Sequence, residues 1–410
     1  MKVITAGKRP IFSWCKDIED GAFEQLVNLA NHPKMFHHIV ALSDCHRGFG
    51  MPIGSVVAMD GAISANCVGA DIGCGVVARR LCLKASDLSS TERKGIDERI
   101  RDLVPVGLGI VNEISTQVGT MFMDKFGDEL MHYGVLQAGD VDYISRSMGT
   151  LGSNNHFVEL QKDEEDNIWI MIHTGSRKLG NMINNRFHKQ GALRLCSMWE
   201  SKIPDPDLAF LPIGTAEASM YISAMTIALT FAKFSREIIL DRCMQSFEDV
   251  IGYYPDVEEA ENQPEVNAHH NYAAVEKHFG KRLWVHRKGA ISVSPGEIGI
   301  IPGDMSSNSY IVIGVDGKEN RDSFHSCSHG AGRAMSRTAA NKMIFTEEAE
   351  ASMEGIIHGP FTKTNIRTGL VSKDTSEAHG SYKDIGEVME QQKGLFDIMH
   401  TLSPIINIKG

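Results

Sequence analysis

The sequence has no apolar run long enough to cross a membrane. Among its 410 residues, no apolar stretch reaches the ~18 residues that a transmembrane helix requires. Met1–Pro10 carries basic residues without an apolar segment, so we expect no secretory signal. The eight cysteines are scattered, with no Cys-x-x-Cys pair and no disulfide-like spacing. These absences predict a cytoplasmic protein that keeps its thiols reduced.

Basic residues are outnumbered by acidic ones, which limits the kinds of nucleic-acid binding that the chain can show. Its 41 Lys and Arg stand against 52 Asp and Glu, for a net charge of −11. This balance argues against a generally basic nucleic-acid binder but permits a local basic cleft. No repeat, low-complexity segment or Pro/Ser-rich linker divides the chain. We therefore expect one domain over residues 1–410, which is long enough to bury a large core.

Strand-like and helix-like segments follow one another without strict βαβ alternation. We therefore predict an α+β (mixed α/β) fold, with mixed sheets and flanking helices. A capping-box signature, Ser89 and Glu92, begins one helix. Residues 107–150, with scattered glycine and mixed polarity, are typical of a mobile flap. Strands are predicted at residues 38–42, 53–59, 75–83, 168–172, 284–293 and 310–315, and helices at 22–31, 90–104, 182–199, 215–249 and 334–343.

A cysteine and several histidines occur beside glycines or at the ends of predicted strands. Asp71 and Cys74 share a glycine-rich loop that lets a carboxylate and a thiolate face one point, as metal ligands do. The alternative is a structural cysteine beside a turn aspartate. The histidines at strand–loop junctions are His156, His173 and the pair His269–His270. Together these residues indicate a centre of one or two metal ions, with zinc the first choice from ligand softness.

His329 lies among small residues in Ser326–Arg337. The helix predicted at 334–343 would place it at or just before a helix N-terminus, which favours phosphate. Arg333 and Arg337 are spaced i, i+4, so on a helix both could hold phosphate oxygens. A neutral imidazole beside a phosphate cradle is suited to accept a phosphoryl or nucleotidyl group. The alternative is a solvated histidine in a loop ahead of a helix.

A second anion-binding loop is predicted where the strand at 168–172 turns into a helix. Arg177 and Lys178 follow a Thr-Gly-Ser turn there, although the segment is not a Walker A sequence. Lys288 belongs to another basic loop. We expect one positive cleft to be lined by the basic residues Arg177, Lys178, Lys288, Arg333 and Arg337.

In their order along the chain, these motifs resemble the RtcB family of GTP-dependent RNA ligases, in its shorter bacterial form. The matching segments are Val68–Gly75, Asn155–Glu159, His173–Arg177, His269–Tyr272, Arg287–Ala290, Ile301–Gly303, Ser326–Arg333 and the closing Lys409–Gly410. The resemblance implies a single RtcB-like catalytic domain. Such a domain joins an RNA 3′-phosphate or 2′,3′-cyclic phosphate to a 5′-hydroxyl, using GTP and Mn²⁺, in RNA repair or tRNA splicing.

The resemblance also implies residue roles, with His329 as the group that becomes guanylylated. The implied ligands of two manganese ions are Asp71, Cys74, His156, His173 and His270, with Cys74 bridging. The implied phosphate contacts are Asn155, Arg177, Lys288, Arg333 and Arg337, and the implied guanine contacts are Glu159, Ser309 and Lys409. The chain departs from the family at Asn154, where Gly is usual, and at Pro302–Ser306, where Asp304 could accept a guanine N–H.

Two other function classes compete with an RNA ligase. One is a metal-dependent phosphoesterase or nuclease acting on RNA, in which His329 only contacts phosphate and no covalent GMP forms. The other is a non-catalytic RNA-binding protein, which the net acidity and the convergent metal-binding residue types argue against. For the ligase, RNA is the expected partner, and an archease-like activator is a further candidate.

Overall fold

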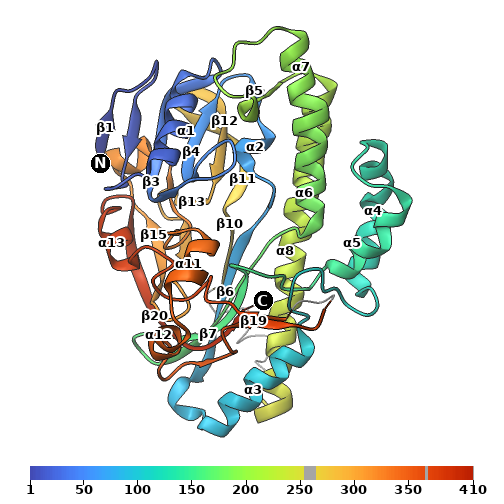
Figure 1. Cartoon of the computed structure of the whole chain (residues 1–410), viewed down its shortest axis with the longest axis vertical. Coiled ribbons are helices and arrows are strands. Elements are labelled where there is room, and N and C mark those ends of the chain that lie inside the picture. The colour runs from blue at the N-terminus through green and yellow to red at the C-terminus, as the bar shows by residue number, and fades with distance from the viewer. Residues whose placement is uncertain (254–264, 365–367, 410) are drawn as a thin grey trace.

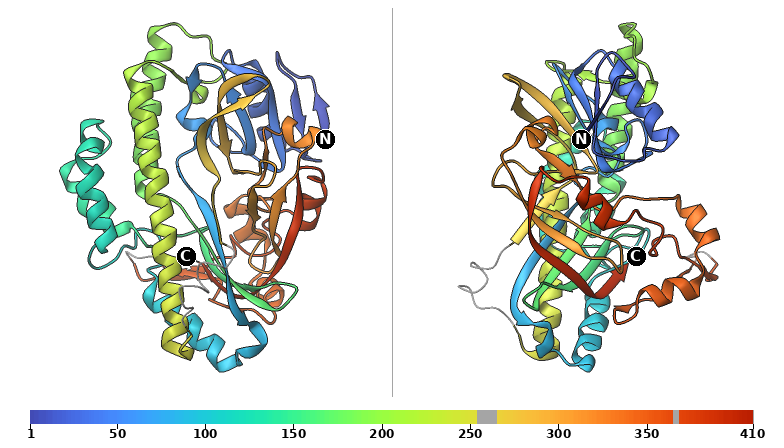
Figure 2. Two further views of the ribbon diagram at one scale, coloured as in Figure 1. Left: turned by 180° about the vertical axis from the view of Figure 1, so that it is seen from behind. Right: turned by 90° about the vertical axis from the view of Figure 1, so that its left-hand side faces the viewer.

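The computed structural model describes residues 1–253, 265–364 and 368–409, and contains two large sheets with a long helix beside them (Figure 1). Helix α8 (Ala216–Ile251) runs along most of the molecule. Helices α4 (Gln117–His132) and α5 (Val141–Ser147) lie on the other side of α8 from the sheets, as the front and rear views show (Figures 1 and 2). Helices combined with mixed sheets confirm the predicted α+β fold.

The first sheet has six strands in the order β1-β2-β3-β4-β12-β11. Strands β2 and β3 pair in parallel, and the other neighbours are antiparallel. Helix α1 (Asp20–Asn31) buries Leu26 and Leu29 in the same apolar cluster as Ile39 and Val57 of the sheet. The strands are β1 (Lys2–Ile4), β2 (Ile11–Ser13), β3 (Met35–His46), β4 (Ile53–Met59), β11 (Asn271–His278) and β12 (Lys281–Lys288).

The second sheet has the strand order β10-β6-β8-β7-β20-β15-β14, with antiparallel neighbours throughout this path. The short strand β17 (Ile357–His358) adds a parallel pair with β20. The strands of the path are β6 (Gly75–Lys84), β7 (Phe157–Lys162), β8 (Asn167–Thr174), β10 (Glu265–His269), β14 (Ile298–Ile301), β15 (Ser309–Gly314) and β20 (Phe396–Lys409).

Helix α8 connects the apolar cores that lie against the two sheets. Thr215 caps its start by accepting a hydrogen bond from the Ala218 N–H, and Gly252 ends it with φ +67°. Phe231 packs in the cluster that also contains α1, whereas Phe247 packs in the cluster of the second sheet. The two ends of the helix are thus buried in different clusters, and α8 joins the two cores.

The remaining described elements are mostly short. The helical ones are α2 (Ala65–Val68), η1 (Ala85–Asp87), α3 (Ser90–Leu103), η2 (Ala138–Asp140), α6 (Lys178–Asn185), η3 (Arg186–Ala192), α7 (Leu193–Met198), η4 (Pro206–Leu208), α10 (Lys318–Asp322), α11 (Arg337–Met343), α12 (Thr346–Ser352) and α13 (Ile385–Glu390). The strands are β5 (Ala62–Ile63), β9 (Leu211–Pro212), β13 (Ala290–Ser292), β16 (Ser326–Ser328), β18 (Thr362–Thr364) and β19 (Val371–Lys373).

Residues 107–150, where we predicted a mobile flap, contain α4 and α5, and Phe122 packs edge-on against Phe231 of α8, with ring centroids 5.4 Å apart. Two local predictions were wrong. The single strand predicted at 284–293 is broken at Gly289, whose φ of +61° separates β12 from β13. The helix predicted at 182–199 begins earlier, at Lys178, and includes the π-helical segment η3.

One other local prediction holds. The capping box of Ser89 and Glu92 begins α3, where the Ser89 hydroxyl accepts from the Glu92 N–H and the Glu92 side chain returns to the Ser89 N–H. Among the described residues, no helix is both long and apolar enough to cross a membrane.

Candidate active site

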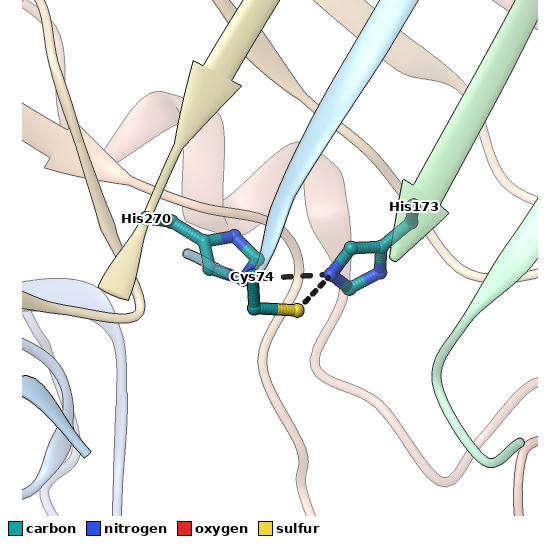
Figure 3. Close-up of side chains that lie close together, drawn as sticks. All are labelled: Cys74, His173 and His270. Atoms are coloured by element: carbon teal, nitrogen blue, oxygen red, sulfur yellow. Dashed lines mark hydrogen bonds between the residues drawn. The ribbon is translucent and has the colours of Figure 1, made fainter. Parts of the chain in front are cut away.

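The predicted metal ligands lie where the ends of four neighbouring strands meet. In the order β10-β6-β8-β7, antiparallel pairing places the end of one strand beside the start of the next. His270 follows β10, Cys74 precedes β6, His173 lies at the end of β8, and His156 precedes β7. Figure 3 shows Cys74, His173 and His270 converging from their separate strands. The sheet topology therefore gathers residues that are far apart in the sequence.

The ligand atoms form two groups that share Cys74. Its Sγ lies 3.2 Å from Nε2 of His173 and 3.4 Å from Nε2 of His156. Nε2 of His173 is 3.4 Å from Nε2 of His270, and Nε2 of His156 is 3.2 Å from Oδ2 of Asp71. Within each group of three residues, the ligand atoms lie within 4.8 Å of one another. Cys74 is therefore the residue that both groups could use to hold a metal ion.

Backbone carbonyls hold two of the imidazoles in the form that binds metal. Nδ1 of His156 is 3.0 Å from the Leu151 carbonyl oxygen, and Nδ1 of His173 is 2.9 Å from that of Asn155. A carbonyl can only accept, so each Nδ1 carries the proton and each Nε2 turns its lone pair to the cluster. The donor set and its orientation therefore fit a divalent metal ion.

The electrostatics of the cluster tie metal binding to proton release. Burial and the neighbouring Asp71 carboxylate raise the pKa of the Cys74 thiol well above its ordinary value. A metal ligand must be a thiolate, so an ion that binds here displaces the thiol proton. Gly175 makes room for the carboxylate, because a Cβ on Gly175 would lie only 2.3 Å from Oδ1 of Asp71.

His329 lies next to this cluster and has a different partner. Its Nδ1 is 2.7 Å from Oδ2 of Asp44, a fully buried carboxylate on β3. The carboxylate accepts a hydrogen bond from the Nδ1–H group, so in the neutral imidazole Nε2 is the nitrogen with the free lone pair. The His329 ring meets the His270 ring edge to face, with centroids 4.6 Å apart. A nucleophilic nitrogen is thereby placed at the border of the candidate metal centre.

The prediction that His329 lies at a helix N-terminus was wrong. His329 follows β16, and helix α11 begins only at Arg337, because Ser336 caps it by accepting from the Ala339 N–H. Arg333 therefore lies outside the helix and shares no helical face with Arg337. The two arginines meet instead at one carboxylate, since Arg333 Nη1 and Arg337 Nε contact Oε1 of Glu377 at 3.1 and 2.7 Å.

A cleft with a volume of about 360 Å³ opens over the histidine and the metal ligands. The predicted site residues that line it are Asp71, Cys74, Asn155, His173, His270, Lys288, His329, Arg333, Arg337 and Lys409. Arg177 and Lys178 were also predicted to line one positive cleft, but they lie outside this lining. Arg177 Nε is 3.3 Å from Oγ1 of Thr150, and Lys178 pairs with Asp140 at 3.2 Å.

Comparison with known proteins identifies the family. The family model described as tRNA-splicing ligase RtcB matches residues 25–410. The chain belongs to the RtcB family. It is 34% identical to the RNA-splicing ligase RtcB of Escherichia coli K12, over 100% of this chain and 99% of that protein. It is 30% identical to the tRNA-splicing ligase RtcB of Methanococcus maripaludis, over 96% of this chain and 92% of that protein.

Of the residues that the RtcB resemblance assigns to guanine, Lys409 lines the cleft, whereas Glu159 and Ser309 are buried outside its lining. Burial raises the pKa of Glu159 to about 8, although Lys409 and hydrogen bonds oppose the shift. Amide groups of Gln161 and Asn407 donate to the Glu159 carboxylate, and Gln161 also donates to Ser309 Oγ at 3.0 Å. These two amides were not predicted from the sequence.

The departure from the RtcB pattern at Asp304 gives that carboxylate partners within this protein. Oδ2 of Asp304 lies 2.8 Å from Nδ1 of His379, and Oδ1 accepts from the Ser306 N–H at 3.0 Å. A guanine N–H would have to share an acceptor that His379 already occupies.

Sequence reasoning missed Asp44 and Glu377, which hold the predicted functional groups. Asp44 is separated from His329 by 285 positions, so no local spacing could connect them. Its one sequence signal was a carboxylate in Ser43–His46, directly after an apolar strand core. Glu377 gave no such signal, because it lies in a polar loop and its role depends on contacts with Arg333 and Arg337, which are distant in the sequence.

Proposed function

We propose that this RtcB-family chain is a GTP- and Mn²⁺-dependent RNA ligase that joins an RNA 3′-phosphate or 2′,3′-cyclic phosphate to a 5′-hydroxyl. Its RNA ligase activity follows from membership in a family whose relatives are named RNA-splicing or tRNA-splicing ligases and match this chain over 99% and 92% of their own length. The observation that carries the chemistry is His329, held by Asp44 with its free nitrogen beside the metal-ligand cluster.

His329 supplies the nucleophile in the first step. Its Nε2 lone pair attacks the α-phosphorus of GTP, a phosphorus–nitrogen bond forms, and pyrophosphate leaves. As the imidazole acquires positive charge, the buried Asp44 carboxylate stabilises the Nδ1 proton opposite. A 2′,3′-cyclic phosphate is first hydrolysed by water to a 3′-phosphate. An oxygen of the 3′-phosphate then attacks the guanylyl phosphorus, which breaks the phosphorus–nitrogen bond and frees His329. Finally the 5′-hydroxyl attacks the phosphorus of the 3′-phosphate, loses its proton to solvent and expels GMP.

The metal centre would be held by Asp71, Cys74, His156, His173 and His270. When bound there, two manganese ions would screen phosphate charge and act as Lewis acids on phosphate oxygens. The basic residues of the cleft, Lys288, Arg333 and Arg337, would hold phosphates of nucleotide and RNA. Asn155 would contact the nucleotide phosphates. Arg177, which lies near Asp71 but outside the cleft lining, would contact an RNA phosphate.

The guanine would lie toward Glu159, Ser309 and Lys409, since a carboxylate and a hydroxyl suit the donors of its edge. Asp304 would assist only after release from His379. Because α8 is buried in the cores of both sheets, we take residues 1–410 as one catalytic domain. The proposal places it in the cytoplasm, with an archease-like protein as a candidate activator.

The decisive experiment is incubation with α-labelled GTP and Mn²⁺, followed by a denaturing gel. The wild-type protein should retain label, because the phosphorus–nitrogen bond survives denaturation. His329→Ala should retain none while keeping its metal content, since the side chain is not among the candidate ligands. Label that persisted on His329→Ala would assign the nucleophile to another residue.

The choice of RNA ends tests the second half of the reaction. Phosphate is a poor electrophile until GMP activates it, so the junction phosphorus should come from the 3′ end of one RNA. A 3′-hydroxyl with a 5′-phosphate should not be joined. RNA labelled in the 3′-phosphate shows which end supplies the junction phosphorus. If the RNA were cleaved, with no joined product and no labelled protein, the chain would be a metal-dependent nuclease instead.

A further inference from the structure

Arg236, near the middle of α8, carries a fully buried guanidinium that contacts residues next to the candidate metal ligands. A buried charge is costly unless its hydrogen-bonding groups are satisfied. Within the described part of the chain, Arg236 forms no ion pair with a carboxylate. Burial lowers the pKa of Arg236 to about 10, so the group remains charged at neutral pH. The groups that Arg236 contacts therefore indicate its function.

On three separate segments, the guanidinium donates to three acceptors and contacts the imidazole of His269, whose Nδ1 also lies 3.0 Å from the Gly73 carbonyl oxygen. Nη1 donates to the carbonyl oxygens of Gly73 at 3.0 Å and Thr174 at 2.9 Å. Nε donates to Oδ1 of Asn267 at 2.8 Å, and Nη2 lies 3.1 Å from Nδ1 of His269. A guanidinium has five N–H donors in a rigid planar fork, so one side chain can hold these groups at fixed separations.

Each of these segments carries a candidate metal ligand next to its contact with Arg236. One carbonyl belongs to the residue before Cys74, the other to the residue after His173, and the imidazole to the residue before His270. The contacts thus lie on the ends of β6, β8 and β10, the strand ends from which these ligands project. Sheet pairing aligns the strands, but it does not by itself set where their last residues stop.

We propose that Arg236 is a positioning residue for the metal centre. Its hydrogen bonds fix the distances between three strand ends. At those distances Cys74, His173 and His270 could bind the same ion. The inference rests on the proposed metal-dependent function and adds to it a residue that contacts no substrate. A lysine at this position would keep a positive charge but lose the fork, so charge and geometry can be separated by experiment.

The test measures metal affinity of the purified full-length protein rather than ligation. Mn²⁺ dissociation constants are measured for the wild type and Arg236→Lys, together with the near-ultraviolet absorption of the Co²⁺-substituted proteins, which reports a metal–thiolate bond. We expect Arg236→Lys to weaken Mn²⁺ binding by about 10- to 100-fold, as loss of a group that orients metal ligands does. The cobalt–thiolate band should fall in parallel.

Arg242→Lys is the matched control, because Arg242 lies on the same helix and also donates to a carbonyl, that of Gly149 at 2.6 Å. This variant should bind Mn²⁺ as the wild type does. Asn267→Ala is the milder test, since it removes only the Nε acceptor, and it decides the matter if Arg236→Lys does not fold. It should weaken Mn²⁺ binding severalfold without loss of the far-ultraviolet circular dichroism of the metal-free protein.

The outcomes separate this inference from the function on which it rests. If the wild type binds Mn²⁺ and the folded variants of Arg236 and Asn267 bind it equally well, the positioning role is overturned and the proposed function stands. If the wild type binds neither Mn²⁺ nor Co²⁺, the metal centre itself is refuted, and the role of Arg236 with it.

Discussion

The proposed mechanism gives the histidines of the site different roles, and the structure gives their Nδ1 atoms different partners. For His156 and His173 that group is a neutral backbone carbonyl, which orients the ring without adding charge. For His329 it is the buried Asp44 carboxylate, which also stabilises a positive imidazole. An orienting carbonyl suits a metal ligand, and a carboxylate suits a nucleophile that becomes charged.

We predict that Asp44→Asn slows guanylylation of His329 by about 10²- to 10⁴-fold, because an amide neither stabilises the charged ring nor enforces its tautomer. The rate of label incorporation from α-labelled GTP measures this effect, with metal analysis alongside. Metal content should not change, as Asp44 is not in the ligand cluster. Asp60→Asn, at a surface ion pair with Lys281, is the control. An unaltered rate in Asp44→Asn would remove Asp44 from the mechanism.

We predict that GTP binding weakens as the pH falls from about 8.5 to 6.5, by up to tenfold per unit. Burial raises the pKa of Glu159 to about 8, so at lower pH the side chain carries a proton and cannot accept two guanine N–H groups. Dissociation constants measured across this range test the slope. Glu159→Gln should bind weakly at every pH, whereas the exposed Glu164→Gln should keep the wild-type profile.

The same carboxyl group should affect stability in the absence of nucleotide. The pKa of Glu159 rises from 4.5 to about 8 on folding, so ionising it costs free energy of folding as the pH rises through that interval. Relative to the wild type, Glu159→Gln should therefore gain thermal stability at pH 8 compared with pH 4. The melting temperatures of the variant and the wild type are measured at both pH values. If the difference between the two proteins were the same at pH 4 and pH 8, ionisation of Glu159 would not affect stability.

At the scale of the elements, the candidate metal centre depends on how neighbouring strands end. The end of β10, the start of β6, the end of β8 and the start of β7 lie side by side, and each carries a candidate ligand. Cys74 occupies the middle of this edge and belongs to both groups of ligand atoms. A ligand common to both groups cannot be lost from one alone.

We therefore predict that Cys74→Ala removes more metal than any single change of His156, His173 or His270 to Ala. Elemental analysis of the purified variants, under one dialysis protocol, provides the comparison. Circular dichroism controls for folding, because Cys74 is buried and its truncation leaves a small cavity. Full metal content in Cys74→Ala would make the cysteine structural, as the alternative from the sequence holds.

Prediction of the elements succeeded where local pattern decides the structure. The long helix α8 was predicted within a few residues, because its cap and apolar spacing are contained in the segment. Prediction failed at Gly289 and at Ser336. At Gly289 a positive φ ends the strand, although the residues that follow have a strand-like composition. At Ser336 the N-cap begins α11, so the helix starts later than the alanines before it suggest.

At the scale of the whole molecule, basic side chains gather in one cleft of a chain whose net charge is −11, although Glu377 pairs with three of them. Lys288, Arg333, Arg337 and Lys409 line one opening, whereas acidic side chains dominate the overall composition. RNA should therefore be attracted to the cleft and repelled elsewhere, which favours one binding orientation.

We predict strongly salt-dependent RNA binding in spite of the acidic balance. Each phosphate neutralised in the cleft should add roughly −0.7 to the slope of log K against log salt for single-stranded RNA. Arg337→Glu should reduce the slope and weaken binding, whereas Lys94→Glu, on the exposed surface of α3, should change little. Fluorescence anisotropy at several salt concentrations provides the values. Equal effects of the two reversals would mean that no local cleft binds the RNA.

The sequence by itself determined which chemistry was available. Asp71 and Cys74 in a glycine loop, histidines at strand ends and His329 among small residues indicated metal and phosphate chemistry, because those signals lie within a few neighbouring residues. Only the tertiary structure decided which groups control them. Asp44 reaches His329 across 285 positions, and Arg236 reaches Thr174 across 62. Such pairs depend on strand register and on helix packing, which arise from the whole chain and leave no local pattern.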